Sequence, residues 1–155
     1  MSEDLSALET WAAELLAKME EGERRGLARK IAVDLRRSQS QRIAAQQNPD
    51  GSGFAPRKGQ ALRGKVGRIK RKAAMFPKLR RPTFLRTESS ADEVAVGFKN
   101  ATVARVARVH QEGLRDRVSR RKGSPEVTYP ARVLLGFTDE DRGRMLDLIV
   151  KHLEA

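Results

Sequence analysis

The stretch TFLRTESSADEVAVGF, residues 83–98, decides the fold class of this chain. It holds two short segments with the composition of β-strands, 83–88 and 93–98, separated by the turn-forming residues SSAD. In the second segment Val94, Val96 and Phe98 occupy alternate positions, as in a strand with one buried face. The stretch therefore predicts an antiparallel β-hairpin.

Helical patterns precede this hairpin. Apolar residues recur at three- and four-residue steps through residues 5–19, which predicts a first helix, and a second helix is expected from about 23 to 47. Gly22 and Gly26 predict a break or kink between the two. Pro49 and the glycines after it end the second helix because proline cannot continue one.

Helical and strand-like patterns also follow the hairpin. Residues 101–110 predict a short helix that ends before Gly113, and residues 126–137 read as a strand that Pro130 makes an edge strand or a bulged one. Thr138 begins a capping box for a last helix. The fold class is therefore α+β, with N-terminal helices, a small antiparallel sheet with a hairpin, a C-terminal helix and a long basic loop.

Length and composition limit the possible classes of protein. At 155 residues, with 39% hydrophobic residues, the chain is expected to form one domain over residues 1–155. It has no cysteine, which excludes disulfide bonds and thiolate metal sites. No apolar run approaches the roughly 20 residues of a membrane span, and the acidic N-terminus is unlike a signal peptide. We expect a cytoplasmic protein without membrane contacts.

The net charge of +12 is distributed unevenly. Residues 1–21 carry six acidic side chains against Lys18, so we expect an acidic helix over 1–22. Residues 54–81 carry eleven basic side chains and no acidic one, and we expect the segment 54–82 to be mobile because like charges repel. The candidate contacts of this basic segment with a polyanion or a neighbouring subunit are Arg57, Lys58, Arg63, Lys65, Arg68, Lys70, Arg71, Lys72, Lys78, Arg80 and Arg81.

His110 and Glu112, in the stretch ARVHQEG, are the first candidates for acid–base catalysis. Side chains two positions apart diverge on a helix, and no nucleophile motif accompanies the pair. We interpret His110 as a hydrogen-bonded residue near the end of an element, where Gly113 turns the chain. The stretch GQALRGKV, 59–66, fails as a P-loop because Val66 replaces the required hydroxyl residue. The sequence predicts no catalytic, cofactor-binding or metal-ligating residues.

The segregated charge permits two interpretations. The basic segment and a second basic cluster at 115–122 could bind nucleic acid through its phosphates, without reading sequence. Alternatively, the acidic helix of one subunit could meet the basic segment of its neighbour. Both interpretations stay open at this level.

Three separated stretches resemble the phage virion morphogenesis family. They are RSQSQRIAAQQNPDGSGFAPRK (37–58), ARVHQEG (107–113) and YPARVLLGFTDED (129–141). Glu112 and Phe54 depart from the aromatic residue and the tryptophan that the family more often has. The motif residues to which the resemblance assigns a structural role are Pro49, Asp50, Gly51, Phe54, Pro56, His110, Gln111, Gly113, Pro130, Ala131, Arg132, Leu135 and Gly136.

The resemblance implies a structural tail completion protein without enzymatic activity or cofactor. Such a protein would act at the head-proximal end of the tail and allow head–tail joining. Its implied partners are itself, in a ring that is expected to be a hexamer, the tail tube or terminator and neck proteins, and the genomic DNA through phosphate contacts. It would be found in the bacterial cytoplasm during assembly and then in the virion.

Overall fold

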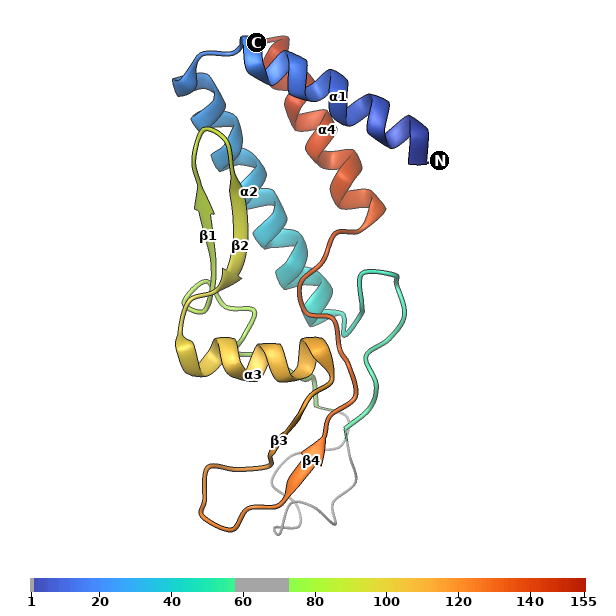
Figure 1. The fold of residues 1–155 in the computed structure, drawn as a ribbon, viewed down its shortest axis with the longest axis vertical. Helices are drawn as coiled ribbons and strands as arrows, with labels where there is room; N and C mark the ends of the chain where they lie inside the picture. The colour runs from blue at the N-terminus through green and yellow to red at the C-terminus, as the bar shows by residue number, and fades with distance from the viewer. Residues whose placement is uncertain (1, 58–72) are drawn as a thin grey trace. The chain divides into compact units, whose positions relative to one another are not determined.

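Figure 1 shows a computed structural model, which describes residues 2–57 and 73–155. The elements follow the order α1, α2, β1, β2, α3, β3, β4, α4. Their bounds are α1 Ser2–Lys18, α2 Glu21–Ala44, β1 Leu85–Ser89, β2 Val94–Phe98, α3 Ala101–Glu112, β3 Arg115–Arg117, β4 Glu126–Thr128 and α4 Asp139–Leu153. The α+β fold class is thereby confirmed. The mobility predicted for the basic segment 54–82 stays a prediction, and its residues 58–72 lie outside the described residues.

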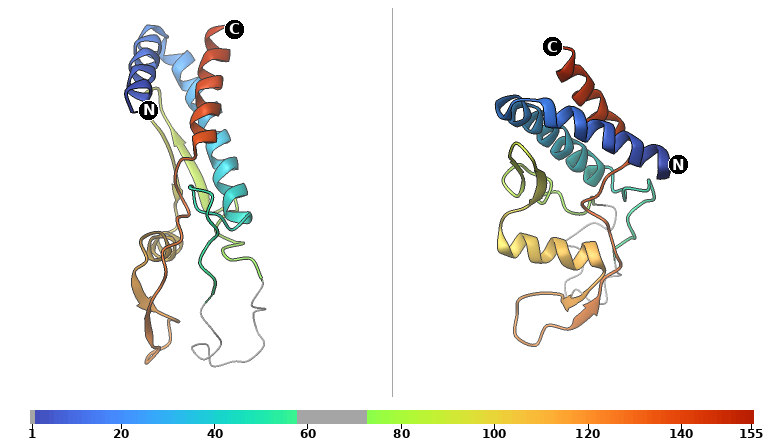
Figure 2. Two further views of the ribbon diagram at one scale, coloured as in Figure 1. Left: turned by 90° about the vertical axis from the view of Figure 1, so that its right-hand side faces the viewer. Right: turned by 45° about the horizontal axis from the view of Figure 1, so that its top comes forward.

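The chain divides into two compact units, which we describe separately. Unit 1 comprises residues 1–35, 87–96 and 139–155, and unit 2 comprises residues 36–86 and 97–138. In unit 1, α1 and α4 lie near the first half of α2 in all three views (Figures 1 and 2). In unit 2, the β3–β4 ribbon extends from the end of α3. The expected single domain stays a prediction.

Apolar residues of α1, α2 and α4 form the interior of unit 1. Its buried residues include Ala12 on α1, Leu27, Ala32 and Leu35 on α2, and Ile149 on α4. Burial of such side chains is the main stabilising contribution to a small helical unit. The positions on α2 repeat at helical spacing, as expected for one face turned to a core.

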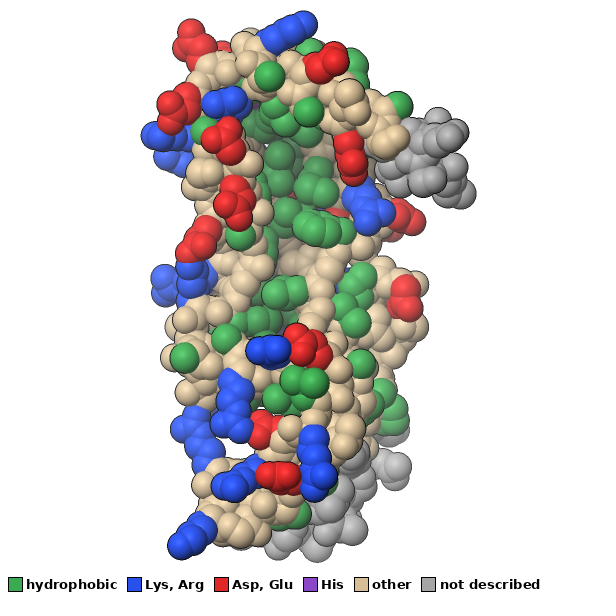
Figure 3. All heavy atoms as spheres, viewed as in Figure 1, with side chains coloured by type: hydrophobic (Ala, Val, Ile, Leu, Met, Phe, Trp, Pro, Cys, Tyr) green, Lys and Arg blue, Asp and Glu red, His purple; other side chains and the backbone are tan. Residues whose placement is uncertain are grey.

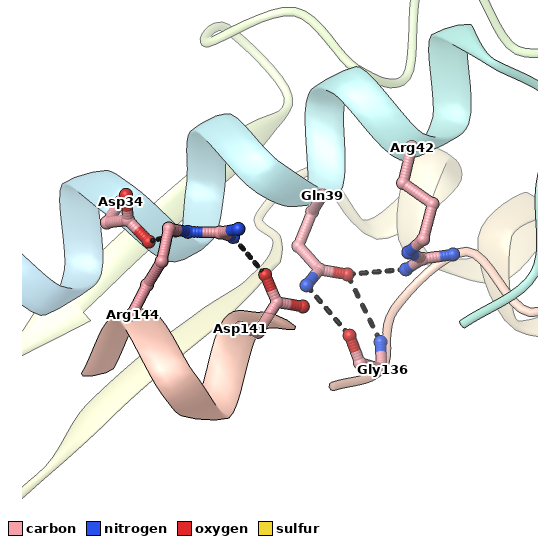
Figure 4. Close-up of polar contacts among 6 residues, drawn as sticks. All are labelled: Asp34, Gln39, Arg42, Gly136, Asp141 and Arg144. Atoms are coloured by element: carbon pink, nitrogen blue, oxygen red, sulfur yellow. Dashed lines mark hydrogen bonds and ion pairs between the residues drawn. The ribbon is translucent and has the colours of Figure 1, made fainter. Parts of the chain in front are cut away.

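A polar cluster adds to these contacts in unit 1. The Arg144 guanidinium on α4 donates to Asp34 of α2 at 3.0 Å and to Asp141 at 2.5 Å, as Figure 4 shows. Asp141 is fully buried, so its charge requires such a partner. The hydrogen bond to Asp34 is the main reason why the pKa of Arg144 is raised.

The break between the first two helices does not fall where the glycines predicted it. It lies at Met19 and Glu20, and both Gly22 and Gly26 are inside α2. A Cβ at either glycine would meet no atom within 4 Å, so neither is required by a close contact. The helical pattern of the residues around Gly22 and Gly26 therefore outweighs the low helix propensity of glycine.

The core of unit 2 consists of Ile43, Phe54, Leu79, Ala107 and Leu134. These residues come from the end of α2, the following loop, the segment before β1, α3 and the chain beyond β4. Met75, Phe76, Phe98 and Val103 pack against them. Residues widely separated in sequence thus meet in one core.

The hairpin prediction is confirmed, since β1 pairs with β2, and Val94, Val96 and Phe98 are half-buried as expected, although burial does not alternate along the strand. All five residues of β2 are half-buried, so neither face is clearly the buried one. Beyond α3, only Glu126–Thr128 of the expected strand 126–137 forms a strand. It pairs antiparallel with β3, where no strand was predicted, in the register Arg115 with Thr128 and Arg117 with Glu126.

Candidate functional site

The segment 132–136, in unit 2, has no regular secondary structure and pairs with no strand among the described residues. Its backbone groups are instead bound chiefly by side chains from α2, α3 and the loop after α2, each described below. Buried backbone N–H and C=O groups need partners. The strand predicted here does not form because the backbone groups bind side chains and not a neighbouring strand. In addition, Pro130 lacks the N–H group that would continue the hydrogen-bond ladder from β4.

Gln39 and Arg42, on the last turns of α2, hold one side of this segment. The Gln39 amide donates to the Gly136 carbonyl at 2.8 Å and accepts from the Gly136 N–H at 3.1 Å, as Figure 4 shows. Arg42 donates to the carbonyls of Val133 and Leu134, both at 2.8 Å, and to the side-chain oxygen of Gln39 at 2.6 Å. Gln39 is 3% exposed and Arg42 is 8% exposed, so these bonds form away from water.

Gln111 and Asn48 bind the same segment. The Gln111 side-chain oxygen, from α3, accepts the N–H groups of Leu134 and Leu135 at 2.8 and 3.0 Å, and its amide donates to the Leu135 carbonyl at 2.9 Å. The Asn48 side-chain oxygen accepts the Val133 N–H at 2.8 Å. Two amides therefore do what a neighbouring strand would do in a sheet.

Two motif glycines meet close neighbours in this region. A Cβ at Gly136 would lie 2.6 Å from Cγ of Pro49, a distance that real Cβ atoms do not show. Gly113 ends α3 with φ 66°, where a side chain is strained, and its Cβ would lie 3.1 Å from the Ala131 nitrogen. Glycine is thus required at both positions.

Arg132 connects the segment to the loop after α2. It is 3% exposed and donates to the carbonyls of Ala55 and Pro56 at 2.7 and 2.8 Å. Its backbone N–H donates to the His110 carbonyl at 2.7 Å. Burial lowers the pKa of Arg132, as does the positive charge of Arg57.

His110 lies between two aromatic rings and a cation. Its ring makes edge contacts with Phe76 and Tyr129, each with centroids 4.8 Å apart, and its Nδ1 lies 3.2 Å from the Arg132 guanidinium. Because a guanidinium only donates, Nδ1 accepts and the neutral ring carries its proton on Nε2. Burial, followed by the charge of Arg132, lowers the pKa of His110 from 6.5 to about 4.

Glu112 is not a partner of His110. Its carboxylate forms an ion pair with Arg108, one turn earlier on α3, at 3.2 Å. No group of three or more His, Asp or Glu residues arranged to hold a metal occurs in residues 2–57 and 73–155. In the part of the chain that the structure describes, the His110 ring contacts Arg132, Phe76 and Tyr129.

The structure brings most of the motif residues together. The loop with Pro49, Phe54 and Pro56 contacts Arg132 and Gly136, and His110 and Gln111 of α3 bind the same segment. Asp50 and Gly51 lie in the turn after α2, where hydrogen bonds from Ser52 lower the pKa of Asp50. Pro130 and Ala131 lead from β4 into the segment.

The candidate contacts of the basic segment are only partly described. Arg57 donates to the carbonyls of Ala73 and Ala74 at 3.2 and 2.9 Å. Lys78, Arg80 and Arg81 are exposed and lie before β1. The other seven, Lys58, Arg63, Lys65, Arg68, Lys70, Arg71 and Lys72, lie outside the described residues.

Sequence reasoning missed Gln39, Arg42 and Asn48. A signal for the first two was present, because they continue the helical spacing of Leu35 and Ile43, where apolar residues are expected. A polar residue on a buried helical face needs a hydrogen-bonding partner. That partner, the backbone of 133–136, comes from a distant part of the sequence and could not be identified from spacing.

Most motif residues of this α+β chain, distant in sequence, thus meet around the segment 132–136. The chain belongs to the phage virion morphogenesis family, whose model matches residues 3–154. It is similar to the tail completion protein S of Escherichia phage P2, with 41% identity over 140 residues, covering 90% of this chain and 91% of that protein. The nucleic-acid-binding alternative gains no support from these relatives.

No solved structure matches this chain. Within the described residues, no helix is both long enough and apolar enough to cross a bilayer.

Proposed function

We propose that this protein is a structural tail completion protein, which acts at the head-proximal end of a phage tail and allows the head to join. The observation that carries the proposal is the similarity to tail completion protein S along nearly the whole of both chains. The family match over residues 3–154 supports the same role.

The geometry supports a structural role without catalysis for His110 and Glu112. The Nδ1 atom of His110 lies within hydrogen-bond distance of Arg132, and its ring packs against two aromatic rings. Glu112 forms an ion pair with Arg108. A general base needs a free nitrogen within reach of a substrate proton and a pKa near the working pH. The lowered pKa of His110 and its contacts suit a structural role, in which the motif residues stabilise unit 2.

The proposed partners are other copies of this chain and proteins of the tail. The copies would form a closed ring, most simply a hexamer to match a six-fold tail, beside the tail tube or terminator and the neck proteins. A head-to-tail ring needs two different complementary patches on each subunit. The protein would assemble in the bacterial cytoplasm and stay in the virion, where its basic side chains would face the phosphates of the passing genome.

Deletion of the gene from its phage or prophage tests this proposal. We expect filled heads and separate tails in lysates, and restoration of infectious particles when the protein is supplied in trans. A His110→Gln protein should also restore them, because its role is structural and folding tolerates a modest loss of stability. Normal infectious particles from the deletion strain would contradict the proposal, and so would a catalytic turnover that disappears with His110→Gln.

A further inference from the structure

The turn between β3 and β4 presents three basic side chains together. Arg120, Arg121 and Lys122 are exposed, and the turn 119–124 contains no acidic residue. Figure 3 shows Lys and Arg side chains over the part of unit 2 that includes this ribbon. We call these three residues the ribbon tip.

The charges of the strands are compensated locally, whereas those of the ribbon tip are not. Arg115 and Arg117 both lie near the Glu126 carboxylate, at 3.3 and 3.8 Å, and Asp116 pairs with Arg105 of α3 at 2.5 Å. In the described residues, no carboxylate lies within ion-pair distance of the ribbon tip. The net positive charge of the ribbon is therefore concentrated at its turn.

The backbone of the turn is fixed by hydrogen bonds. Val118 donates to the Pro125 carbonyl at 3.0 Å, and Ser119 N–H donates to the Ser124 hydroxyl at 2.9 Å. Gly123 has φ 80°, which glycine adopts readily. A turn ordered in this way presents its side chains with less loss of conformational entropy on binding.

A complementary surface lies on α1. Trp11 is the only tryptophan of the chain and is 46% exposed, and Glu14, also exposed, lies three positions later on the same helical face. Residues 9–23 carry five acidic side chains against Lys18, a net charge of −4. Figure 3 shows several acidic side chains on the visible face of unit 1. Arginine binds both to carboxylates and to the face of a tryptophan.

We propose that the ribbon tip of one copy binds the Trp11 and Glu14 face of α1 in a second copy, with Glu9 and Glu20 adding to the attraction. The inference rests on the proposed self-assembly and specifies its interface. Because the two surfaces differ, each subunit can use one surface toward each neighbour, as a head-to-tail ring requires. The association should weaken as ionic strength rises, since exposed charges are screened.

Charge reversal tests this interface. Variant A carries Arg120→Glu, Arg121→Glu and Lys122→Glu, and variant B carries Glu9→Lys, Glu14→Lys and Glu20→Lys. We expect wild type to form a concentration-dependent oligomer in mass photometry, and each variant alone to associate on the order of tenfold or more weakly. An equimolar mixture of A and B should regain association, because each like-charged pair is then replaced by an attractive one.

The fluorescence of Trp11 reports the same contact. Its emission should shift to shorter wavelength as wild type associates, and should do so again in the mixture of A and B. The matched control, Arg29→Glu with Arg37→Glu and Lys151→Glu, changes three exposed bases outside the ribbon and should associate as wild type does. Circular dichroism melts of all variants identify any loss of folding.

The results of these experiments distinguish a wrong interface from a wrong proposal of self-assembly. A wild-type protein that stays monomeric contradicts both the ring and the interface. An oligomer that variant A leaves intact contradicts the interface while the ring stands. If variant A associates normally but binds duplex DNA more weakly than wild type does, the ribbon tip is a phosphate-binding surface and the proposal is wrong.

Discussion

At the level of single residues, Gln39 shows how a side-chain amide can supply the hydrogen bonds that a neighbouring strand would make. Its amide binds both backbone groups of Gly136 and also receives Arg42. Gln39→Ala would leave these buried groups without partners, so we expect a loss of about 2 kcal/mol in the free energy of unfolding. Urea denaturation measures this. Gln41→Ala, on an exposed position of the same helix, is the control and should change the stability by less than about 0.5 kcal/mol.

Two glycines should respond oppositely to the same substitution. Gly136→Ala forces a Cβ against Pro49, so we expect a destabilisation of about 1–3 kcal/mol. Gly143 lies inside α4, where a Cβ would meet no atom within 4 Å, and Gly143→Ala should stabilise by about 0.5–1 kcal/mol. Thermal melts of both proteins decide this. An equal effect of both substitutions would contradict the close packing of Gly136 on Pro49.

The lowered pKa of His110 predicts that the free energy of unfolding decreases in acid. Because this pKa is about 4 in the folded chain and 6.5 ordinarily, the unfolded chain binds more protons between these values. Stability should therefore fall as the pH drops from about 6.5 to about 4 and show no further loss from His110 below that, with a total of about 1–2 kcal/mol because solvent partly screens this half-buried ring. The difference between wild type and His110→Gln isolates this contribution. An imidazole that titrates near 6.5 by NMR would contradict it.

At the scale of elements, α3 follows directly from its sequence. The Asn100 side chain caps it by accepting from the N–H groups of Thr102 and Val103 at 3.0 and 3.2 Å, and Gly113 ends it. Asn100→Ala should cost about 1 kcal/mol, whereas Asn100→Asp should keep most of the stability because a carboxylate also accepts. Chemical denaturation of both proteins measures this. A fall in stability for Asn100→Asp as large as that for Asn100→Ala would show that the cap is not the cause.

The strands could be predicted only where their signals are local. The turn residues SSAD, 89–92, run from the last residue of β1 toward β2, and they predict the hairpin that the structure shows. β3 and β4 have three residues each, which is too short for a periodic pattern, and their pairing brings Arg115 and Arg117 near Glu126. Residues 133–135 resemble a strand because they are apolar, but the partners of the segment 133–136, Gln39, Gln111 and Arg42, are distant in sequence.

At the scale of the whole molecule, the resemblance to the family depended on three motifs in order, and the structure explains their association. Pro49 of the first contacts Gly136 of the third, and Gln111 of the second binds Leu134 and Leu135. The division into two units was not expected from composition, because α2 and the β1–β2 hairpin both contribute to each unit. Patterns in the sequence predict single helices and strands. They do not predict the boundary between two compact units, because that boundary depends on contacts between residues that are distant in sequence.

The proposed function places this protein at the end of the tail where the head joins. Electron microscopy of purified particles that carry a label fused to this chain tests that position. We expect the label as a single ring at the junction of tail and head, and at the corresponding end of tails without heads. A label along the tail, at the distal end or absent from finished particles would contradict this role.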